Sequence, residues 1–308
     1  MRITNNYLNN NLLLNLGVSQ ERMAKLQNQL STGLKISRPS DDPTGIESAL
    51  RLKNSIANVQ QWKANASEGL SYMDSADSTL QDMGTILHRA SELAVQGANG
   101  TMTTEDREKV ALEIDQLKEH LVQLANTKVG DKYIFSGTAN VEPFPQGEYK
   151  TGAEGAETWQ WVGAGDEVEY PVGSNIRLAI TVNGKDLFSV KEENGTMEIG
   201  LLKSFEKLSN ALRTSNNEDL QASISELDAH SDNIVSSRAL LGARTNRMES
   251  IENQLDATLF HLTKNYSDIM DADMASTMIE FKTVENAYTA ALSVGSRIIQ
   301  PSLVDFMK

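Results

Sequence analysis

MASTMIEFKTVENAYTAALSVGSRI, residues 274–298, sets the architecture of this chain, because apolar or small residues recur in it in alternating steps of three and four. The recurring positions are Met274, Thr277, Phe281, Val284, Tyr288, Ala291, Gly295 and Ile298. This spacing places them on one side of an α-helix and is typical of a coiled coil. Such a helix is only marginally stable alone in water, since most helical stability comes from packing of an amphipathic face. The stretch therefore predicts a helix that needs a partner.

The N-terminal region carries a stripe with the same step, formed by Leu16, Ser19, Met23, Leu26 and Leu30. Residues 1–37 sum to a charge of +3 and residues 264–308 to −2, so charge favours pairing of the two ends. We predict that segments 1–40 and 264–308 form a coiled coil. The predicted interface, for pairing and for assembly, consists of Leu16, Met23, Leu26, Leu30, Met274, Phe281, Val284, Tyr288, Ala291 and Ile298.

Between these ends, apolar periodicity predicts a helical rod formed by residues 41–136 and 201–263. A first helix is expected to run to about Ala94 and to stop at the glycine-containing stretch 97–100. Thr103 or Thr104 should cap the next helix, whose seam consists of Val110, Ile114, Leu117, Leu121 and Leu124. A further stripe begins at Leu220 and continues to Leu262. These helices should form a bundle.

The stretch GLKISRPSDDPTG, residues 33–45, interrupts the first helical zone. Residues that precede proline avoid the α region, so Pro39 and Pro43 predict an extended or turning path. Asp41 or Asp42 should then cap the next helix, because a carboxylate is stabilised near the positive end of the helix dipole. We interpret the two adjacent carboxylates as helix caps rather than as a catalytic acid and base.

Residues 137–200 have a different composition, since they contain ten of the twenty glycines and carry a net charge of −7. Short β-prone runs cover residues 157–162, 167–172, 176–182 and 187–190, and Asn183-Gly184 predicts a type I′ hairpin turn. The predicted fold is therefore mainly α with inserted β (α+β). It is an elongated bundle of long helices with coiled-coil termini and one small β-rich domain.

Composition excludes several classes of function. The net charge of −14 argues against nucleic acid as a partner, because phosphate binding needs clustered Lys and Arg. The absence of cysteine excludes disulfides and thiolate metal sites. Residues 1–16 lack the continuous apolar stretch of a secretory signal, and no run of about 18 apolar residues predicts membrane insertion.

No pattern of residues predicts catalysis, and we expect no catalytic, cofactor-binding or metal-binding residues and no cofactor. The four histidines, His88, His120, His230 and His261, lack metal-ligand spacing. Asp268, Asp271 and Asp273 resemble a calcium loop but lack its glycine and its final glutamate. Trp159 and Trp161 share one side of a predicted strand, which favours packing in a small sheet over a sugar platform.

Two signatures resemble those of the bacterial flagellin family. The first covers residues 30–45 and includes Pro39, Asp41, Asp42, Pro43 and Gly45. The second covers residues 241–249 and includes Gly242, Ala243, Arg244, Asn246 and Arg247. MRITNNY at residues 1–7, KYIFSG at 132–137 and LVDFMK at 303–308 are similar to the branch of that family found at the junction between hook and filament.

The resemblance implies an extracellular structural adapter in the bacterial flagellum, exported through the flagellar type III apparatus without a cleavable signal. It implies that the chain joins hook-associated protein 1 to flagellin and forms a ring of about eleven copies of itself. An export chaperone is expected to bind the terminal segment. Terminal helices that are mobile before assembly would become ordered against their neighbours.

Three alternatives remain open at the level of sequence. The chain could be flagellin itself, which differs in polymerising without limit. It could be a surface enzyme hosted in the β-rich region, in which case Glu167 or Glu169 would carry turnover. It could also be a cytoplasmic coiled-coil signalling rod, which cell fractionation would distinguish.

Overall fold

The computed structural model describes residues 2–99, 102–145, 150–151, 157–158, 161–191 and 198–299. The chain divides into two compact units. Unit 1 consists of Met1–Asn58 and Ala257–Lys308, and unit 2 consists of Val59–Asp256. Both are mainly helical, with small two-stranded sheets in unit 2, which confirms the predicted α+β class. The five-part domain division stays a prediction.

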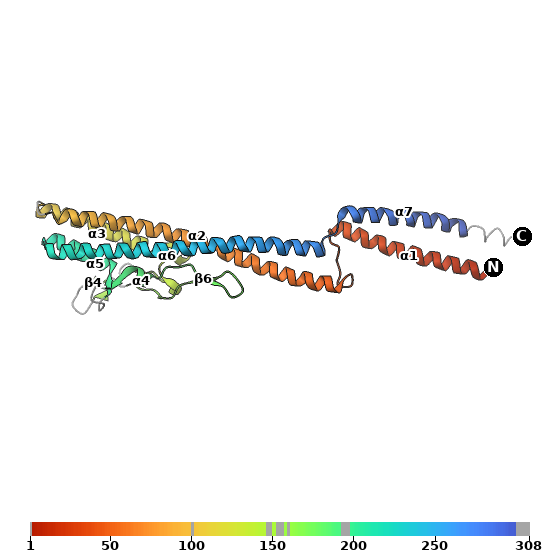
Figure 1. The fold of residues 1–308 in the computed structure, drawn as a ribbon, viewed down its shortest axis with the longest axis horizontal. Coiled ribbons are helices and arrows are strands. Elements are labelled where there is room, and N and C mark those ends of the chain that lie inside the picture. Colours follow the sequence, from red (N-terminus) through yellow and green to blue (C-terminus); the bar gives the residue numbers. More distant parts are fainter. Residues whose placement is uncertain are drawn as a thin grey trace. The chain divides into compact units, whose positions relative to one another are not determined.

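Unit 1 is built around the two chain ends. Helix α1, Arg2–Thr32, lies beside helix α7, Met274–Ile299 (Figure 1). The unit also contains the start of α2, Pro43–Gly97, and the end of α6, Asn217–Met270. Ile36, Ala49 and Met270 form a small buried cluster there. The predicted pairing of the N- and C-terminal helices is therefore confirmed.

Unit 2 packs α2 and α6 with α3, Thr104–Ala125, and α5, Leu201–Thr214. Helices α3 and α5 are in direct contact. Apolar periodicity builds the core, because residues spaced by three and four fall on the inward face of each helix. Its largest fully buried side chains include Phe135, Phe205, Met73, Leu80, Met83, Leu87, Leu93, Ile114 and Leu121.

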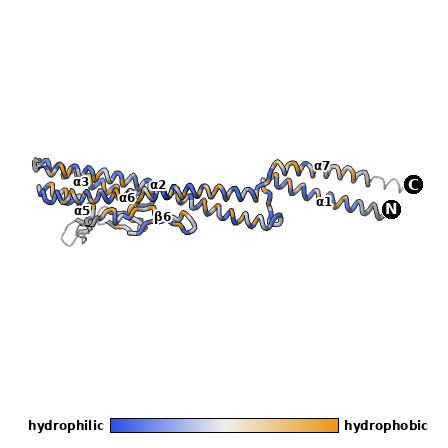
Figure 2. Tube along the Cα trace, viewed as in Figure 1, coloured by the Kyte–Doolittle hydropathy of each residue, from blue (hydrophilic) through white to orange (hydrophobic). Residues whose placement is uncertain are grey.

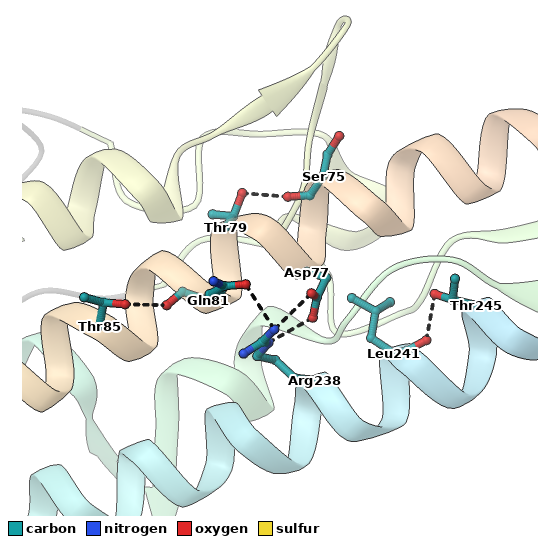
Figure 3. A network of polar contacts seen from close by, with 8 residues as sticks. All are labelled: Ser75, Asp77, Thr79, Gln81, Thr85, Arg238, Leu241 and Thr245. Atoms are coloured by element: carbon teal, nitrogen blue, oxygen red, sulfur yellow. Dashed lines mark hydrogen bonds and ion pairs between the residues drawn. The ribbon is translucent and has the colours of Figure 1, made fainter.

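A polar connection ties α2 to α6 beside this core (Figure 3). The Arg238 guanidinium on α6 donates to both Asp77 carboxylate oxygens on α2, at 2.9 and 3.0 Å. A further guanidinium hydrogen bond reaches Gln81 Oε1 at 3.4 Å. The Asp77 carboxylate raises the pKa of Arg238. The paired geometry fixes the register of the two helices.

The β structure consists of four antiparallel pairs of short strands. Strand β1, Lys128–Val129, pairs with β2, Lys132–Tyr133, and β3, Lys150–Thr151, pairs with β4, Glu157–Thr158. Strand β5, Glu169–Pro171, pairs with β6, Arg177–Ala179, and β7, Ser189–Lys191, pairs with β8, Glu198–Gly200. A 3-10 turn, η1, covers Gly137–Ala139. The described strands thus form separate ribbons rather than one sheet.

The predicted hairpin at Asn183-Gly184 is wrong. Asn183 has a φ of −67° and caps a short helix, α4, Gly184–Phe188, by accepting a hydrogen bond from the Lys185 N–H at 3.0 Å. Glycine is required at 184 for space, since a Cβ there would lie 2.2 Å from the Phe135 carbonyl oxygen. The predicted strand 187–190 is also wrong at its start, because Leu187 and Phe188 end α4.

The observed ends of helices α2 and α3 agree with the sequence-based predictions better than the strands do. Thr103 caps α3 by accepting from the Asp106 N–H, which confirms one of the two predicted caps. Helix α2 ends at Gly97, as predicted, but not with the positive φ of a glycine C-cap. A Cβ at Gly97 would lie 2.2 Å from Leu212 Cδ2, so this glycine permits close packing of α5.

Candidate assembly site

We define the terminal helix pair as α1 and α7. Leu26, Thr277 and Gly295 are its most buried described positions, and a Cβ at Gly295 would lie 2.7 Å from Leu12 Cδ2. Of the positions in the two predicted 3-4 stripes, those that are partly buried are Leu16, Ser19, Met23, Leu30, Phe281, Val284, Tyr288 and Ala291. Met274 is 48% exposed, and the side chain of Ile298 lies outside the described residues. The pair therefore has one apolar seam.

A second set of apolar side chains on the same helices, which we call the outward apolar set, is largely exposed to solvent. Tyr7, Leu13, Leu14 and Val18 on α1 are 65–67% exposed. Met278, Ile279, Leu292 and Val294 on α7 are 45–69% exposed. Orange, apolar segments recur along both helices (Figure 2). Exposed apolar side chains in such number are typical of surfaces that become covered on assembly.

Sequence reasoning missed this outward set, since it considered only positions in a 3-4 step. The signal was present as large apolar residues off that step, at positions 13, 14, 18, 278 and 279. An apolar groove of about 500 Å³ lies between the two helices, lined by Asn9, Leu12, Leu13, Leu16, Leu292, Gly295 and Ser296. The terminal helix pair thus has both exposed apolar side chains and an apolar groove on its surface.

Backbone pairing attaches the first signature to the end of α6. We call residues 33–45 the signature joint. Gly33, with a φ of +72°, ends α1 and turns the chain. The Lys35 N–H then donates to the Met270 carbonyl at 2.7 Å, and the Ala272 N–H donates to the Gly33 carbonyl at 2.8 Å. The joint is therefore a defined structure between α1 and α2.

The two aspartates of the signature joint have separate tasks. Asp41 accepts hydrogen bonds from the Arg38 N–H at 3.1 Å and the Ser37 N–H at 3.3 Å, and it contacts Lys25 Nζ at 3.1 Å. The bond from Lys25 is the main cause that lowers the Asp41 pKa, followed by that from Arg38. Asp41 therefore orders the turn.

Asp42 caps α2, as one of the two predicted alternatives. Its Oδ1 accepts from the Gly45 N–H at 3.0 Å and the Thr44 N–H at 3.1 Å. These bonds, led by that from Gly45, lower the Asp42 pKa. Pro43 opens the helix, where its missing N–H costs nothing. A Cβ at Gly45 would lie 2.4 Å from Asp42 Oδ2, so the signature needs glycine there.

Arg244 is the residue of the second signature that contacts the β-rich region. Its guanidinium donates to both Glu167 carboxylate oxygens, at 3.0 and 2.9 Å, and to the Thr181 carbonyl at 2.8 Å. Gly242, Ala243, Asn246 and Arg247 are exposed on the same helix. Glu167 was considered above as a residue that could carry turnover. In the structure its carboxylate binds Arg244, which is a structural role.

The other residues weighed for chemistry lie apart. His230 is buried and His88, His120 and His261 are exposed, and the described residues contain no group of three His, Cys, Asp or Glu side chains able to hold a metal ion. Asp273 accepts from the Ala275 N–H at the start of α7, and Asp271 bonds Ser267. Trp161 donates from Nε1 to the Phe135 carbonyl, and Trp159 lies outside the described residues.

None of the described helices combines the length and the apolar character needed to cross a membrane. The fold and the candidate site together define a helical structural protein in which both ends of the chain form one unit.

Comparison with known proteins agrees with this class. The bacterial flagellin N-terminal helical region matches residues 3–140, and the bacterial flagellin C-terminal helical region matches residues 224–307. Flagellin of Bacillus subtilis (strain 168) is 29% identical over 293 residues, covering 91% of this chain and 90% of the relative. Flagellar hook-associated protein 3 of Escherichia coli (strain K12) is 26% identical over 292 residues, covering 89% of each.

Solved structures share the fold. A putative flagellar hook-associated protein from Vibrio parahaemolyticus has a TM-score of 0.66 at 17% identity, covering 75% of this chain and 100% of that chain. FlgL of Bacillus cereus has a TM-score of 0.56 at 22% identity, covering 70% and 99%. The chain belongs to the bacterial flagellin family. It is a structural protein of the flagellum and not an enzyme.

Proposed function

We propose that this chain is the adapter at the hook–filament junction, joining hook-associated protein 1 to the flagellin filament. The observation that carries the proposal is the outward apolar set on the terminal helix pair, exemplified by Leu14 and Ile279 at 67% and 69% exposure. Covering one such side chain contributes about 1.5–3 kcal/mol relative to leaving it exposed. Neighbouring subunits with similar helices would supply that cover.

The choice of a junction role over that of the filament subunit rests on three short stretches, MRITNNY, KYIFSG and LVDFMK. KYIFSG has a structural role in unit 2, since Ile134 and Phe135 are fully buried and the Tyr72 hydroxyl donates to the Ile134 carbonyl. Gly137 closes the stretch with a φ of +63°. The resemblance further supports export through the flagellar type III apparatus with a chaperone, and a ring of about eleven copies.

Ordering of the terminal helix pair is part of the proposed mechanism. A single seam between two helices buries little apolar surface to offset the conformational entropy of about 1–2 kcal/mol per ordered residue. Neighbouring subunits would therefore stabilise α1 and α7 on assembly, and the isolated monomer would not polymerise prematurely. Hydrogen exchange on the monomer tests this, and full protection of α1 and α7 before assembly would contradict it.

A strain that lacks this chain provides the functional test. We expect electron micrographs of hooks that carry hook-associated protein 1 but no filament, with flagellin released into the medium. Complementation by the full chain should restore filaments. If the chain is instead the filament subunit, the purified protein will extend into long filaments. The medium of the deletion strain will then contain no released flagellin.

A further inference from the structure

A polar groove in unit 1 has no role in the packing described above. It has a volume of about 510 Å³ and lies between the second half of α1 and the signature joint. Its charged lining consists of Glu21, Arg22, Lys25, Arg38 and Asp41, and its remaining lining of Val18, Ala24, Asn28, Ser37 and Ser40. Three cations thus face two carboxylates, and the groove has a net charge of +1.

The cations of the groove differ in how firmly they are held. Lys25 is paired with Asp41, whose carboxylate is also bound by backbone N–H groups of the joint. Arg22 contacts Glu280 at 3.5 Å, but both side chains are more than half exposed, so water screens the pair. The Arg38 guanidinium has no hydrogen-bond or ion-pair partner among the described residues. Arg22 and Arg38 are therefore available to a carboxylate from outside.

The charge of the chain identifies where such carboxylates lie. Residues 59–256, which form unit 2, contain 32 Asp and Glu against 17 Lys and Arg, a net charge of −15. Unit 1 contains 11 Lys and Arg against 10 Asp and Glu, a net charge of +1. The groove thus presents two arginines, Arg22 and Arg38, that are not held by a buried carboxylate, on a chain whose other unit is strongly acidic.

We propose that this groove binds the acidic surface of unit 2 of a second copy of the chain, through Arg22 and Arg38. The inference rests on the proposed function, because a ring brings several copies together. Packed copies bring their acidic units close to one another, and like charges repel unless a cation lies between them. The two groove arginines supply those cations, and their planar guanidinium groups suit carboxylate recognition.

The groove contact also makes the interface heterologous, since unit 1 of one copy meets unit 2 of the next. An interface of this type closes into a ring or continues as a helical array, whereas a contact between identical surfaces stops at a dimer. The terminal helix pair would dock through its apolar side chains. Arg22 and Arg38 would in addition fix the register of the two copies and select the correct partner surface.

Photo-crosslinking in intact flagella tests the occupant of the groove. A photoreactive amino acid encoded at Ser40, which lines the groove, should yield an adduct between two copies of this chain whose peptides map to residues 59–256. The same amino acid at Ser55, an exposed position outside the groove, serves as the matched control and should not give that adduct. An adduct with another flagellar protein, an adduct within unit 1, or no adduct would overturn the proposal.

A charge series keeps the proposal testable if the probe at Ser40 disturbs assembly. Arg22→Glu combined with Arg38→Glu should lower incorporation of the chain into flagella about tenfold, the equivalent of about 1.4 kcal/mol. Arg22→Lys combined with Arg38→Lys should retain most of it, and so should Arg51→Glu, which reverses an exposed charge outside the groove. Equal incorporation of the Glu and Lys pairs would overturn the groove contact without affecting the deletion phenotype.

Discussion

Unit 2 and the terminal helix pair of unit 1 are both helical but differ in how their apolar residues are used. In unit 2, side chains as large as Phe205 and Leu80 are fully buried, and paired hydrogen bonds such as those of Arg238 fix the helices. In the terminal pair, Leu26 is buried while Leu14 is 67% exposed. One region completes its core within the chain, and the other leaves large apolar side chains exposed for neighbours.

The largest expected effect concerns the core of unit 2. Phe205→Ala should lower the free energy of unfolding by about 3–5 kcal/mol, because it removes a buried ring and leaves a cavity. Urea unfolding followed by circular dichroism measures this loss. Leu26→Ala in the terminal pair should leave that main transition in place and instead speed hydrogen exchange in α1 and α7. Equal shifts of the main transition would remove the distinction between the two regions.

His230 provides a pH-dependent test of the same core. Burial lowers its pKa from the ordinary value of 6.5 to about 4, a shift that the Glu226 carboxylate partly opposes. Between pH 6.5 and 4, His230 is therefore protonated in the unfolded chain but neutral in the folded chain. The stability that is present above pH 6.5 is lost as the pH falls towards 4. The loss should approach about 3 kcal/mol.

The control for this pH dependence is His230→Gln, which stays polar but does not titrate. Urea unfolding at pH 7, 5.5 and 4.5 should show a smaller decline for the variant than for the natural chain. Other carboxylates titrate in both proteins, so the difference isolates His230. Ser204 Oγ lies 3.4 Å from His230 Nε2 and donates to Glu226 at 2.8 Å, and the variant should keep the latter bond. Parallel pH curves would contradict the prediction.

Arg244 tests how the β-rich region is attached. Arg244→Lys keeps the charge but cannot contact the Glu167 carboxylate and the Thr181 carbonyl from two separate nitrogens, as Nη2 and Nη1 of Arg244 do, at a cost of about 1–2 kcal/mol. Amides near the contact, such as Val168 and Ile180, should exchange faster. Arg247→Lys, in the same signature but exposed, is the matched control and should change neither quantity.

The sequence was sufficient for the parts of the fold that repeat. The 3-4 step at Phe281, Val284 and Tyr288 predicted a helix that needs a partner, and α7 lies against α1. Pro39 and Pro43 predicted the turn within residues 33–45, and Asp42 caps the helix that follows it, as one of the two predicted alternatives. Local patterns predict well where local physics determines the structure.

The sequence failed where distant contacts decide. Asn183-Gly184 has the composition of a hairpin turn, but Asn183 caps a helix there instead, and the distant Phe135 carbonyl leaves no room for a Cβ at position 184. The groove at Arg22 and Arg38 depends on how the signature joint folds back along α1, which no local pattern encodes. The outward position of Leu14 likewise depended on knowing the partner of α1.

Asp42 gives a smaller effect, confined to unit 1. Asp42→Ala should speed exchange of the Thr44 and Gly45 amides and leave the main unfolding transition unchanged, because only the cap of α2 is lost. Asp42→Asn retains an acceptor oxygen and should behave more like the natural chain. Since the Asp42 pKa is lowered, the contribution of its charge is present at neutral pH and lost as pH falls through that lowered value.

The smallest expected effect on stability is at Leu14, and it separates the two regions most sharply. Leu14→Ser should change the free energy of unfolding by less than about 0.5 kcal/mol, because the side chain is 67% exposed in the monomer. Incorporation into flagella should nevertheless fall, since that side chain is expected to be covered by a neighbour. Leu50→Ser is the matched control, as Leu50 is 57% exposed on α2 outside the terminal helix pair. Normal incorporation of the Leu14 variant would mean that the outward apolar set of α1 does not face a partner at this position, and the comparison would then have to rest on α7 alone.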